Sequence, residues 1–259
     1  MPLPVQVYQL SEQERPCDHS VKVGIVNEMT HLADYLQELE LAAPRDTLVI
    51  VGGASGLDTD RQVQLESLFN RVLAPLAEEL QLYVVDGGTD AGVMRLMGQA
   101  RTTIGGTFPL IGVAPQSLVS LPDRAAEHPD ASTLEPHHTH CLLVPGENWG
   151  DESAWIAEIA TQLSGSHESL TILVNGGSVT VKDAYASIKA GREVLIISGT
   201  GRVADDLTAA LRYKVLEGKT VDDPRIAALI DRSDEFLTAI DLDNNPEAFI
   251  QDLRLMFRE

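Results

Sequence analysis

The stretch Val84-Val85-Asp86-Gly87-Gly88-Thr89-Asp90-Ala91-Gly92-Val93-Met94 is a short apolar run that stops at two glycines and then resumes with helical spacing. This order predicts a strand, a glycine turn and the start of a helix. Glycine allows a tight turn and lets a ligand approach the main chain, while the first N–H groups of a helix are unpaired and carry partial positive charge. The stretch therefore predicts a turn that binds phosphate.

The same arrangement occurs three more times along the chain. Apolar runs end at glycine in residues 49–56, 172–178 and 196–202, which read VIVGGASG, ILVNGGS and IISGTGR. Continuous apolar strands that alternate with helices predict an α/β fold of the Rossmann-like, doubly wound type, with a mainly parallel sheet of about six to eight strands and helices on both faces. Right-handed crossovers place every strand-to-helix turn at the carboxyl edge of such a sheet, so we expect the glycine turns to converge on one crevice.

The regular alternation begins near residue 47, which divides the chain into two parts of different character. We expect a single domain over residues 47–259, with an N-terminal extension over residues 1–46 packed on it. Residues 116–136 follow neither the helical nor the strand period and are rich in Pro, Asp, Ser and His. They predict a long loop that helps to close the site.

The composition excludes several classes of partner. The formal net charge of −20 would repel a nucleic acid or an anionic membrane, whereas a small phosphorylated ligand held by main-chain N–H groups is compatible with it. The apolar runs are far shorter than the roughly 20 residues that span a bilayer, and no signal peptide opens the chain, so we expect a cytoplasmic protein. The spacing of Cys17 and Cys141 is not typical of a metal site or a redox motif. The sequence does not decide between a monomer and a homo-oligomer.

Glycines and polar residues at the four turns are the candidate ligand contacts. The glycines are Gly52, Gly53, Gly87, Gly88, Gly176, Gly177, Gly199 and Gly201, and the hydroxyl residues beside them are Ser55, Thr89, Ser178 and Thr200. Each has an alternative role, because glycine also serves in tight turns and hydroxyl groups also cap helices. Arg202 follows the last turn, where its guanidinium group suits a diphosphate or else pairs with a neighbouring aspartate.

Histidines gather in the run Glu135-Pro136-His137-His138-Thr139-His140, where His138 and His140 share one face if the run is extended. Zinc sites normally have three or four protein ligands, and no matching Cys or His cluster occurs elsewhere in the sequence, so we expect no metal. We expect His138 to hydrogen-bond a ligand or to have a structural role at the start of the next strand. The chain also lacks the nucleophile elbow and the P-loop, which removes the simplest hydrolase and ATPase assignments.

Five motifs in order resemble the SLOG-like domain of melastatin-type TRP channels (TRPM), whose free-standing prokaryotic versions are called LSDAT. They are residues 84–100, 111–115, 138–144, 174–178 and 198–207, and the resemblance covers roughly residues 47–210. It implies a Rossmann-like fold that senses nucleotide-derived ligands, with ADP-ribose and NAD-related molecules as the leading candidates and no required cofactor. We therefore expect a sensor-type domain that stands alone and binds its ligand at the glycine turns.

The wider superfamily includes phosphoribohydrolases of the LOG type, whose Pro-Gly-Gly-x-Gly-Thr-x-x-Glu motif falls on residues 175–183. Gly176, Gly177 and Thr180 match that motif, but the leading proline, the third glycine and the glutamate do not. Asp183 stands at the glutamate position, so the resemblance implies that an enzyme would cleave an N-glycosidic bond, with Asp183 or Glu152 as the acid/base group. Binding without catalysis is favoured because the third glycine is lost, and a structural or assembly domain without ligand is the third alternative.

Overall fold

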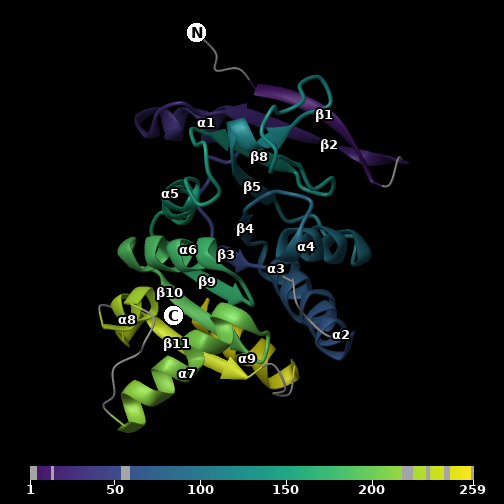
Figure 1. Cartoon of the computed structure of the whole chain (residues 1–259). Helices are drawn as coiled ribbons and strands as arrows, with labels where there is room; N and C mark the ends of the chain where they lie inside the picture. The colour runs from purple at the N-terminus through teal and green to yellow at the C-terminus, as the bar shows by residue number, and fades with distance from the viewer. Residues whose placement is uncertain are drawn as a thin grey trace.

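The computed structural model describes residues 5–12, 15–53, 59–217, 224–231, 234–241 and 246–257. Its main sheet has nine strands in the order β1-β2-β8-β5-β4-β3-β9-β10-β11 (Figure 1). Their bounds are β1 (Val5–Glu12), β2 (Arg15–Ile25), β3 (Thr47–Gly52), β4 (Tyr83–Asp86), β5 (Leu110–Pro115), β8 (His140–Val144), β9 (Ser169–Val174), β10 (Glu193–Ser198) and β11 (Leu237–Asp241). Only β1 and β2 pair antiparallel among these described strands, which confirms the predicted Rossmann-like, mainly parallel sheet.

The predicted N-terminal extension supplies two strands to this sheet. β2 pairs in parallel with β8, and β1 forms the outer edge beside β2. Both strands carry alternating apolar residues, and Tyr8, Leu10, Val21 and Val23 are buried in one cluster. The sheet therefore has more strands than the predicted six to eight, because residues 5–25 join it.

The order of the strands changes direction at β3. From β3 the chain moves outward through β4, β5 and β8, and it then returns to β9 on the other side of β3. In open α/β sheets, ligands bind at the carboxyl end of the strands where such a reversal occurs. The topology therefore places the ends of β3, β4 and β9 around one crevice.

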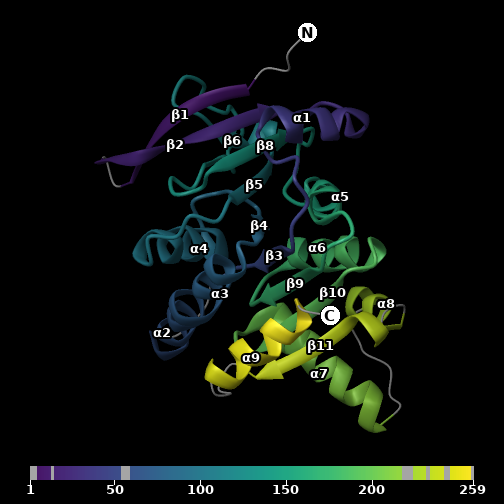
Figure 2. The same ribbon diagram turned by 180° about the vertical axis from the view of Figure 1, so that it is seen from behind.

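Helices cover both faces of the sheet, as Figures 1 and 2 show from opposite sides. One face carries α1 (Leu32–Glu38), α5 (Ser153–Ser164), α6 (Ser178–Lys189), α7 (Arg202–Glu217) and α8 (Pro224–Asp231). The other carries α2 (Thr59–Leu68), α3 (Ala74–Leu80), α4 (Gly92–Thr103) and α9 (Pro246–Met256). Alternate residues of one strand face opposite layers, since Val49 and Val51 pack in the first layer while Leu48 and Ile50 pack in the second.

Apolar residues recur at helical spacing from Val63 to Leu80, but the helix that this spacing predicts is interrupted before Pro75. A π-helical turn, Phe69–Leu73, separates α2 from α3, and Pro75 lies at the start of α3. Proline has no N–H and clashes with the carbonyl four residues earlier, so the regular hydrogen-bond pattern cannot continue through this point. The interruption takes the form of a local change in helical pitch just before Pro75.

The predicted long loop after β5 takes the place of a helix on part of the sheet. Val119, Leu121 and Leu134 pack in one buried cluster with Cys141 and Leu143 of β8. Two short strands, β6 (Val119–Ser120) and β7 (Ser132–Thr133), pair within the loop. The two ends of the loop are thus part of the core, whereas residues 122–133 are partly or fully exposed.

Two further observations complete the fold. The sequence reading assigned no helix to residues 224–231, where the structure has α8, whose Ile226, Leu229 and Ile230 are buried. Among the described residues, no helix is both long enough and apolar enough to cross a membrane.

Candidate functional site

A cavity of about 420 Å³ lies at the carboxyl edge of the sheet, beside the point where the strand order reverses. We call it the switch-point cavity. It is lined by the ends of β3 and β4, the segment 130–132 and the starts of α5 and α6, through Ile50, Val51, Gly52, Gly87, Thr89, Ala91, Met94, Asp130, Ala131, Ser132, Trp149, Glu152, Ile156, Val179 and Asp183. The predicted convergence of turns therefore occurs for Gly52, Gly87 and Thr89, together with both acid/base candidates.

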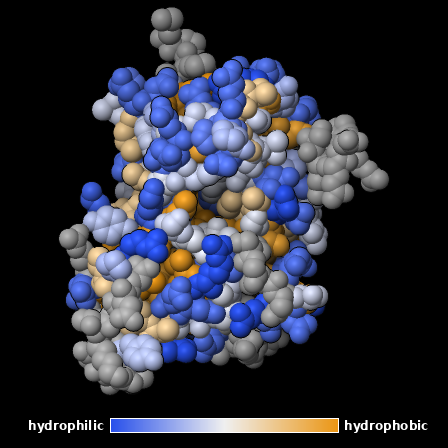
Figure 3. All heavy atoms as spheres, in the orientation of Figure 1, coloured by the Kyte–Doolittle hydropathy of each residue, from blue (hydrophilic) through white to orange (hydrophobic). Residues whose placement is uncertain are grey.

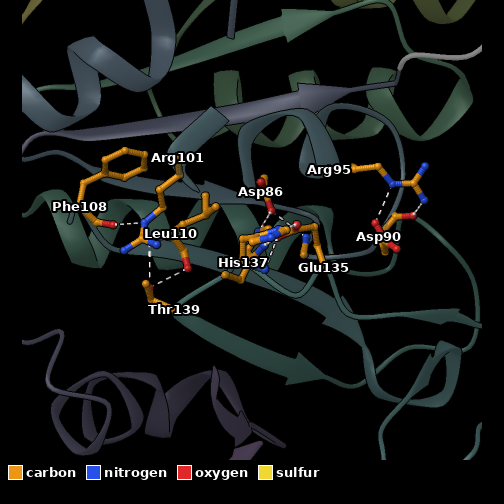
Figure 4. A network of polar contacts seen from close by, with 11 residues as sticks. Asp86, Asp90, Arg95, Arg101, Phe108, Leu110, Glu135, His137 and Thr139 are labelled. Atoms are coloured by element: carbon orange, nitrogen blue, oxygen red, sulfur yellow. Dashed lines mark hydrogen bonds and ion pairs between the residues drawn. The ribbon is translucent and has the colours of Figure 1, made fainter. Parts of the chain in front are cut away.

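A second cavity of about 430 Å³, the α2–α4 cavity, adjoins the first one. The two cavities share Gly52, Ala91 and Met94, and the second is further lined by Gly53 and by residues of α2 and α4, including Arg95. Arg95 donates from Nε to Asp90 Oδ1 at 2.7 Å at the start of α4 (Figure 4). The second cavity is therefore lined by one cationic side chain, Arg95, and one carboxyl group, Glu66, whereas, among the described residues, carboxyl groups without a cation line the first.

Glycine is required at the β3 and β4 turns by close contacts between backbones. A Cβ at Gly52, where φ is +140°, would lie 1.8 Å from the carbonyl oxygen of Val174. A Cβ at Gly88 would lie 2.7 Å from the Cα of Gly112. The sequence suggested that repeated glycine makes room for a ligand, but at Gly52 and Gly88 the room is taken by a neighbouring strand.

Asp183 and Glu152 are both buried side chains that reach the switch-point cavity. Asp183 Oδ1 accepts a hydrogen bond from the Ser153 hydroxyl at 2.5 Å, and Glu152 Oε2 accepts one from the Gly150 N–H at 2.7 Å. Burial raises the pKa of Asp183 to about 7 against the opposing hydrogen bond from Ser153, and burial also raises the pKa of Glu152. The cavity therefore holds one carboxyl group, that of Asp183, with a pKa near neutral pH, beside a second one, that of Glu152, whose pKa is also raised.

Trp149 is a cavity residue that the sequence reading missed. It lies in the turn between β8 and α5, and its indole Nε1 donates to the carbonyl oxygen of Asp130 at 3.3 Å. This contact joins the turn to the only part of the long loop that lines the cavity, residues 130–132. A tryptophan in a turn rich in Gly, Asn and Asp was the signal available in the sequence, since such a turn contributes little to packing.

The β9 and β10 turns do not line the switch-point cavity, and their polar groups bond to one another. The Asn175 N–H donates to Thr200 Oγ1 at 2.8 Å, and Asn175 Nδ2 donates to the Thr200 carbonyl at 2.6 Å. Thr180 Oγ1 accepts from the Gly177 N–H at 3.1 Å, as a capping residue does. Gly199 donates its N–H to Asp205 Oδ1 at 2.6 Å. The structural alternatives that we weighed for these residues are thus present.

The remaining predicted contacts on this side are exposed or half-buried, except for Gly176, which is buried. Ser178 is exposed at the first position of α6, and Gly176 and Gly201 have φ of +93° and +90°. The guanidinium of the exposed Arg202 lies beside Gly177, because a Cβ there would be 3.1 Å from Arg202 Nη2. Ser55 lies outside the described residues.

His138 lies beneath the turn rather than in the wall of either cavity. Only 1% of the residue is exposed, and both ring nitrogens contact carboxylates, those of Glu135 and Asp86. His138 therefore has the structural role that we considered. Direct contact between His138 and a ligand would require His138, Glu135 and Asp86 to move apart. No group of three or more His, Cys, Asp or Glu in the described part of the chain is arranged to hold a metal ion.

Comparison with known proteins identifies relatives of two kinds. A family model described as "SLOG in TRPM, prokaryote" matches residues 45–251. The transient receptor potential cation channel subfamily M member 2 of Rattus norvegicus and that of Mus musculus are each 24% identical over 217 residues, which cover 70% of this chain and 14% of the relative. The subfamily M member-like 2 protein of Nematostella vectensis is 22% identical over 227 residues, covering 72% of this chain and 14% of its own length.

This chain thus spans about 14% of the length of these channel relatives. Among solved structures, the X-ray structure of the structural genomics target TM1055 superposes with a TM-score of 0.50 at 18% identity. The match covers 82% of this chain and 99% of that chain, so the two proteins share a fold.

Proposed function

This chain belongs to the prokaryotic family of SLOG domains related to TRPM, and we propose that it binds a nucleotide-derived ligand of the ADP-ribose or NAD class at the carboxyl edge of its sheet. The observation that carries the proposal is the switch-point cavity, where Gly87 and Thr89 lie together with Asp183, Glu152 and Trp149. Its size is in the usual range of small-molecule sites, which runs from about 300 to 1,000 Å³.

The carboxyl groups of Asp183 and Glu152 favour a ribose as the part of the ligand that lies beside them. Ser153 donates to one oxygen of Asp183, and within the described residues no second donor reaches that carboxyl group. A carboxylate oxygen accepts hydrogen bonds, and ribose hydroxyls are donors of the required kind. Phosphate is disfavoured beside Asp183 and Glu152 because like charges repel in a buried site.

Trp149 favours a ligand that contains a planar base. Its indole lines the cavity and is held by the hydrogen bond to Asp130, so a ring stacked on it would not need to order a mobile side chain. An adenine or nicotinamide ring fits this requirement.

Phosphate groups are placed by this proposal away from the two acids, along Gly87–Thr89 and toward the α2–α4 cavity. The N-terminus of α4 has no side-chain cap from Ala91, so its first N–H groups suit an anion. Arg95 adds a positive charge on the same side. A ligand with both a nucleoside and a diphosphate would therefore reach from one cavity into the other.

Calorimetry with ADP-ribose, NAD, cyclic ADP-ribose and AMP tests the proposal directly. We expect at least one of these to bind to the wild-type chain, and we expect Thr89→Val to weaken binding by about tenfold because one hydrogen bond to a charged group is lost. Thr103→Val is the matched control, since Thr103 lies exposed at the far end of α4. Absence of binding by all four ligands at millimolar concentration would overturn the proposal.

A second function, cleavage of an N-glycosidic bond, is favoured by one specific observation. Asp183 has a pKa of about 7 in the cavity that also holds Glu152, which suits a group that donates a proton to a leaving base at neutral pH. This alternative predicts release of free base or nicotinamide over time, abolished by Asp183→Asn. Tight binding with no release of base or nicotinamide over hours would contradict the hydrolase function and leave ligand binding as the only function of the two.

A further inference from the structure

His138 occupies a buried position between two acidic side chains, directly beneath the turn that ends β4. Its Nε2 lies 2.8 Å from Asp86 Oδ1 and its Nδ1 lies 2.7 Å from Glu135 Oε2. Exposure is 1% for His138 and 0% for both acids. Figure 4 shows Asp86, Glu135 and His137 of this cluster pointing toward one another.

The hydrogen bonds indicate the charge of the ring. Both acids act as acceptors toward backbone donors as well, because the Gly88 N–H donates to Asp86 Oδ1 at 2.7 Å and the His137 N–H donates to Glu135 Oε2 at 2.9 Å. Both contacts are satisfied when the two acids are ionised and accept from His138, in which case each ring nitrogen carries a proton. The ring is then an imidazolium cation that bridges two carboxylates.

The titration of the groups agrees with this arrangement. Burial opposes the charge on His138, but Asp86 and Glu135 outweigh burial and raise the pKa of His138 to about 10. Burial is likewise outweighed at Glu135, where hydrogen bonds from His137 and His138 lower the pKa to about 2. Burial lowers the pKa of Arg101 on α4, and the nearby charge of Glu135 opposes this shift. Burial and the charge of Asp86 raise the pKa of the neighbouring Cys141 thiol.

Two glycines make the space for the cluster. A Cβ at Gly98, in the middle of α4, would lie 2.2 Å from Glu135 Oε2. A Cβ at Gly112 of β5 would lie 2.4 Å from the Cα of Gly88 and 3.3 Å from the ring of His138. Gly98 lies inside a helix, where glycine is less favourable than alanine. The position is explained by the carboxylate that fills the place of a side chain.

The cluster holds the turn from both sides. Asp86 accepts from the Gly88 N–H, and the Glu135 N–H donates to the Gly88 carbonyl at 2.9 Å. Thr89 forms a bridge with Leu134, and the Asp90 N–H donates to the Thr133 carbonyl at 2.9 Å. Residues 133–138 of the loop and the turn Gly87–Asp90 are therefore one hydrogen-bonded unit, with His138 joining its two acids.

We infer that His138 is a positioning residue: as a buried imidazolium it fixes the Gly87–Thr89 turn against residues 133–138 and so sets the place of Thr89 in the switch-point cavity. The effect on affinity rests on the proposed ligand site. The charge of the ring and the order of the turn do not, so they can be tested without a ligand.

The charge is tested by NMR on the wild-type chain with 15N-labelled histidine. We expect two low-field ring N–H protons from His138, with 15N shifts of an imidazolium that persist up to pH 8. A ring that carries one proton at pH 8, or that titrates near the ordinary pKa of 6.5, would overturn the inference. This experiment needs no variant, so a folding failure cannot hide the answer.

The positioning role is tested with His138→Gln, which keeps polar atoms but removes the cation. We expect amide exchange at Gly88 and Thr89 to become faster, and affinity for the tightest of the four nucleotide ligands to fall about tenfold or more. His31→Gln, at an exposed histidine of the turn before α1, is the control and should change neither. Unchanged exchange and unchanged affinity in a folded His138→Gln would contradict the role.

A variant with a similar loss of Tm separates positioning from general instability. Leu163→Ala removes a buried side chain at the far end of α5 and should lower Tm without altering exchange at Gly88 or the affinity. Equal loss of affinity in both variants would assign His138 a merely structural role. If no nucleotide binds to the wild type, the proposed function fails while the exchange and NMR results still decide the inference.

Discussion

The β3–β4 turns and the β9–β10 turns have the same sequence pattern, an apolar strand followed by glycines and a hydroxyl residue, yet they differ in where their polar groups lie. At β4, Thr89 lines a cavity together with Gly87. At β9 and β10, Asn175 and Thr200 bond to each other and are buried. In the space-filling view, apolar side chains reach the surface in a hollow near mid-height of the molecule, bordered by polar ones (Figure 3).

The difference shows that two properties of a turn are separate: whether its backbone needs glycine, and whether it can bind a ligand. Glycine is needed wherever a strand end passes close to its neighbour, as at Gly52 and Gly88. A ligand can bind only where polar groups remain unsatisfied by the protein and a cavity adjoins them. Gly52 and Gly88 have the first property, and the two cavities adjoin the same β3 and β4 turns.

The largest effect is expected from Gly52→Ala, which tests the contact between the two halves of the sheet. The new Cβ would lie 1.8 Å from the Val174 carbonyl, so β3 and β9 must separate, at a cost on the order of 4 kcal/mol or more. Urea denaturation measures the loss. Gly105→Ala is the control, because φ there is also positive at +64° but no atom lies within 4 Å of the new Cβ. Equal losses would mean that only the positive φ matters.

A pH-dependent effect is expected from Asp183→Asn in the switch-point cavity. The pKa of Asp183 is about 7 in the folded chain and about 3.8 when unfolded, so the wild type loses stability as pH rises from 4 to 7. Asparagine cannot ionise, so the variant should exceed the wild type at pH 8 by a few kcal/mol, with about 4 as the upper limit. Thermal unfolding at pH 5 and pH 8 checks this, with Asp34→Asn on α1 as the exposed control. A constant difference across pH contradicts the raised pKa.

A smaller loss of stability is expected from Asn175→Ala on the other side of the comparison. The change removes the bond to Thr200 and the bond that Asn175 Oδ1 accepts from Gly176 at 2.7 Å, at a residue with φ of +54°. We expect a loss of about 3 kcal/mol with little effect on affinity for a ligand in the cavity. Asn148→Ala, at an exposed asparagine, should cost much less. A folded Asn175→Ala that has lost all binding would shift the site toward β9.

The smallest effect concerns two arginines on opposite sides of the crevice. Arg95→Gln should weaken ADP-ribose more than Arg202→Gln, because Arg95 lines a cavity that adjoins the proposed site. We expect about fivefold for Arg95 and about twofold for Arg202, in line with the range for exposed charges. Calorimetry at two salt concentrations measures both. The reverse order would place the phosphates at the β9–β10 turns.

Much of the fold could be predicted because its signals are local. Apolar runs that end at glycine, such as those before Gly52 and Gly87, depend only on neighbours in the sequence, and the structure has the strands β3 and β4 there. The entry of residues 5–25 into the main sheet was missed, since pairing with β8 is a contact over more than a hundred residues. The candidate acids Asp183 and Glu152 were identified by motif and position, and the cavity that joins them was not.

The sequence by itself determined the Rossmann-like class, the alternation of strands and helices, the position of each glycine turn and the family resemblance, because these follow from residue type and spacing along one chain. Only the tertiary structure decided which turns adjoin a cavity, that Trp149 lies in its wall, and that His138 is buried between Asp86 and Glu135. Those outcomes depend on which strands become neighbours and on which polar groups find partners across the sheet. Hydrogen-bond satisfaction in a buried site is a property of the assembled fold, so no single stretch of sequence carries it.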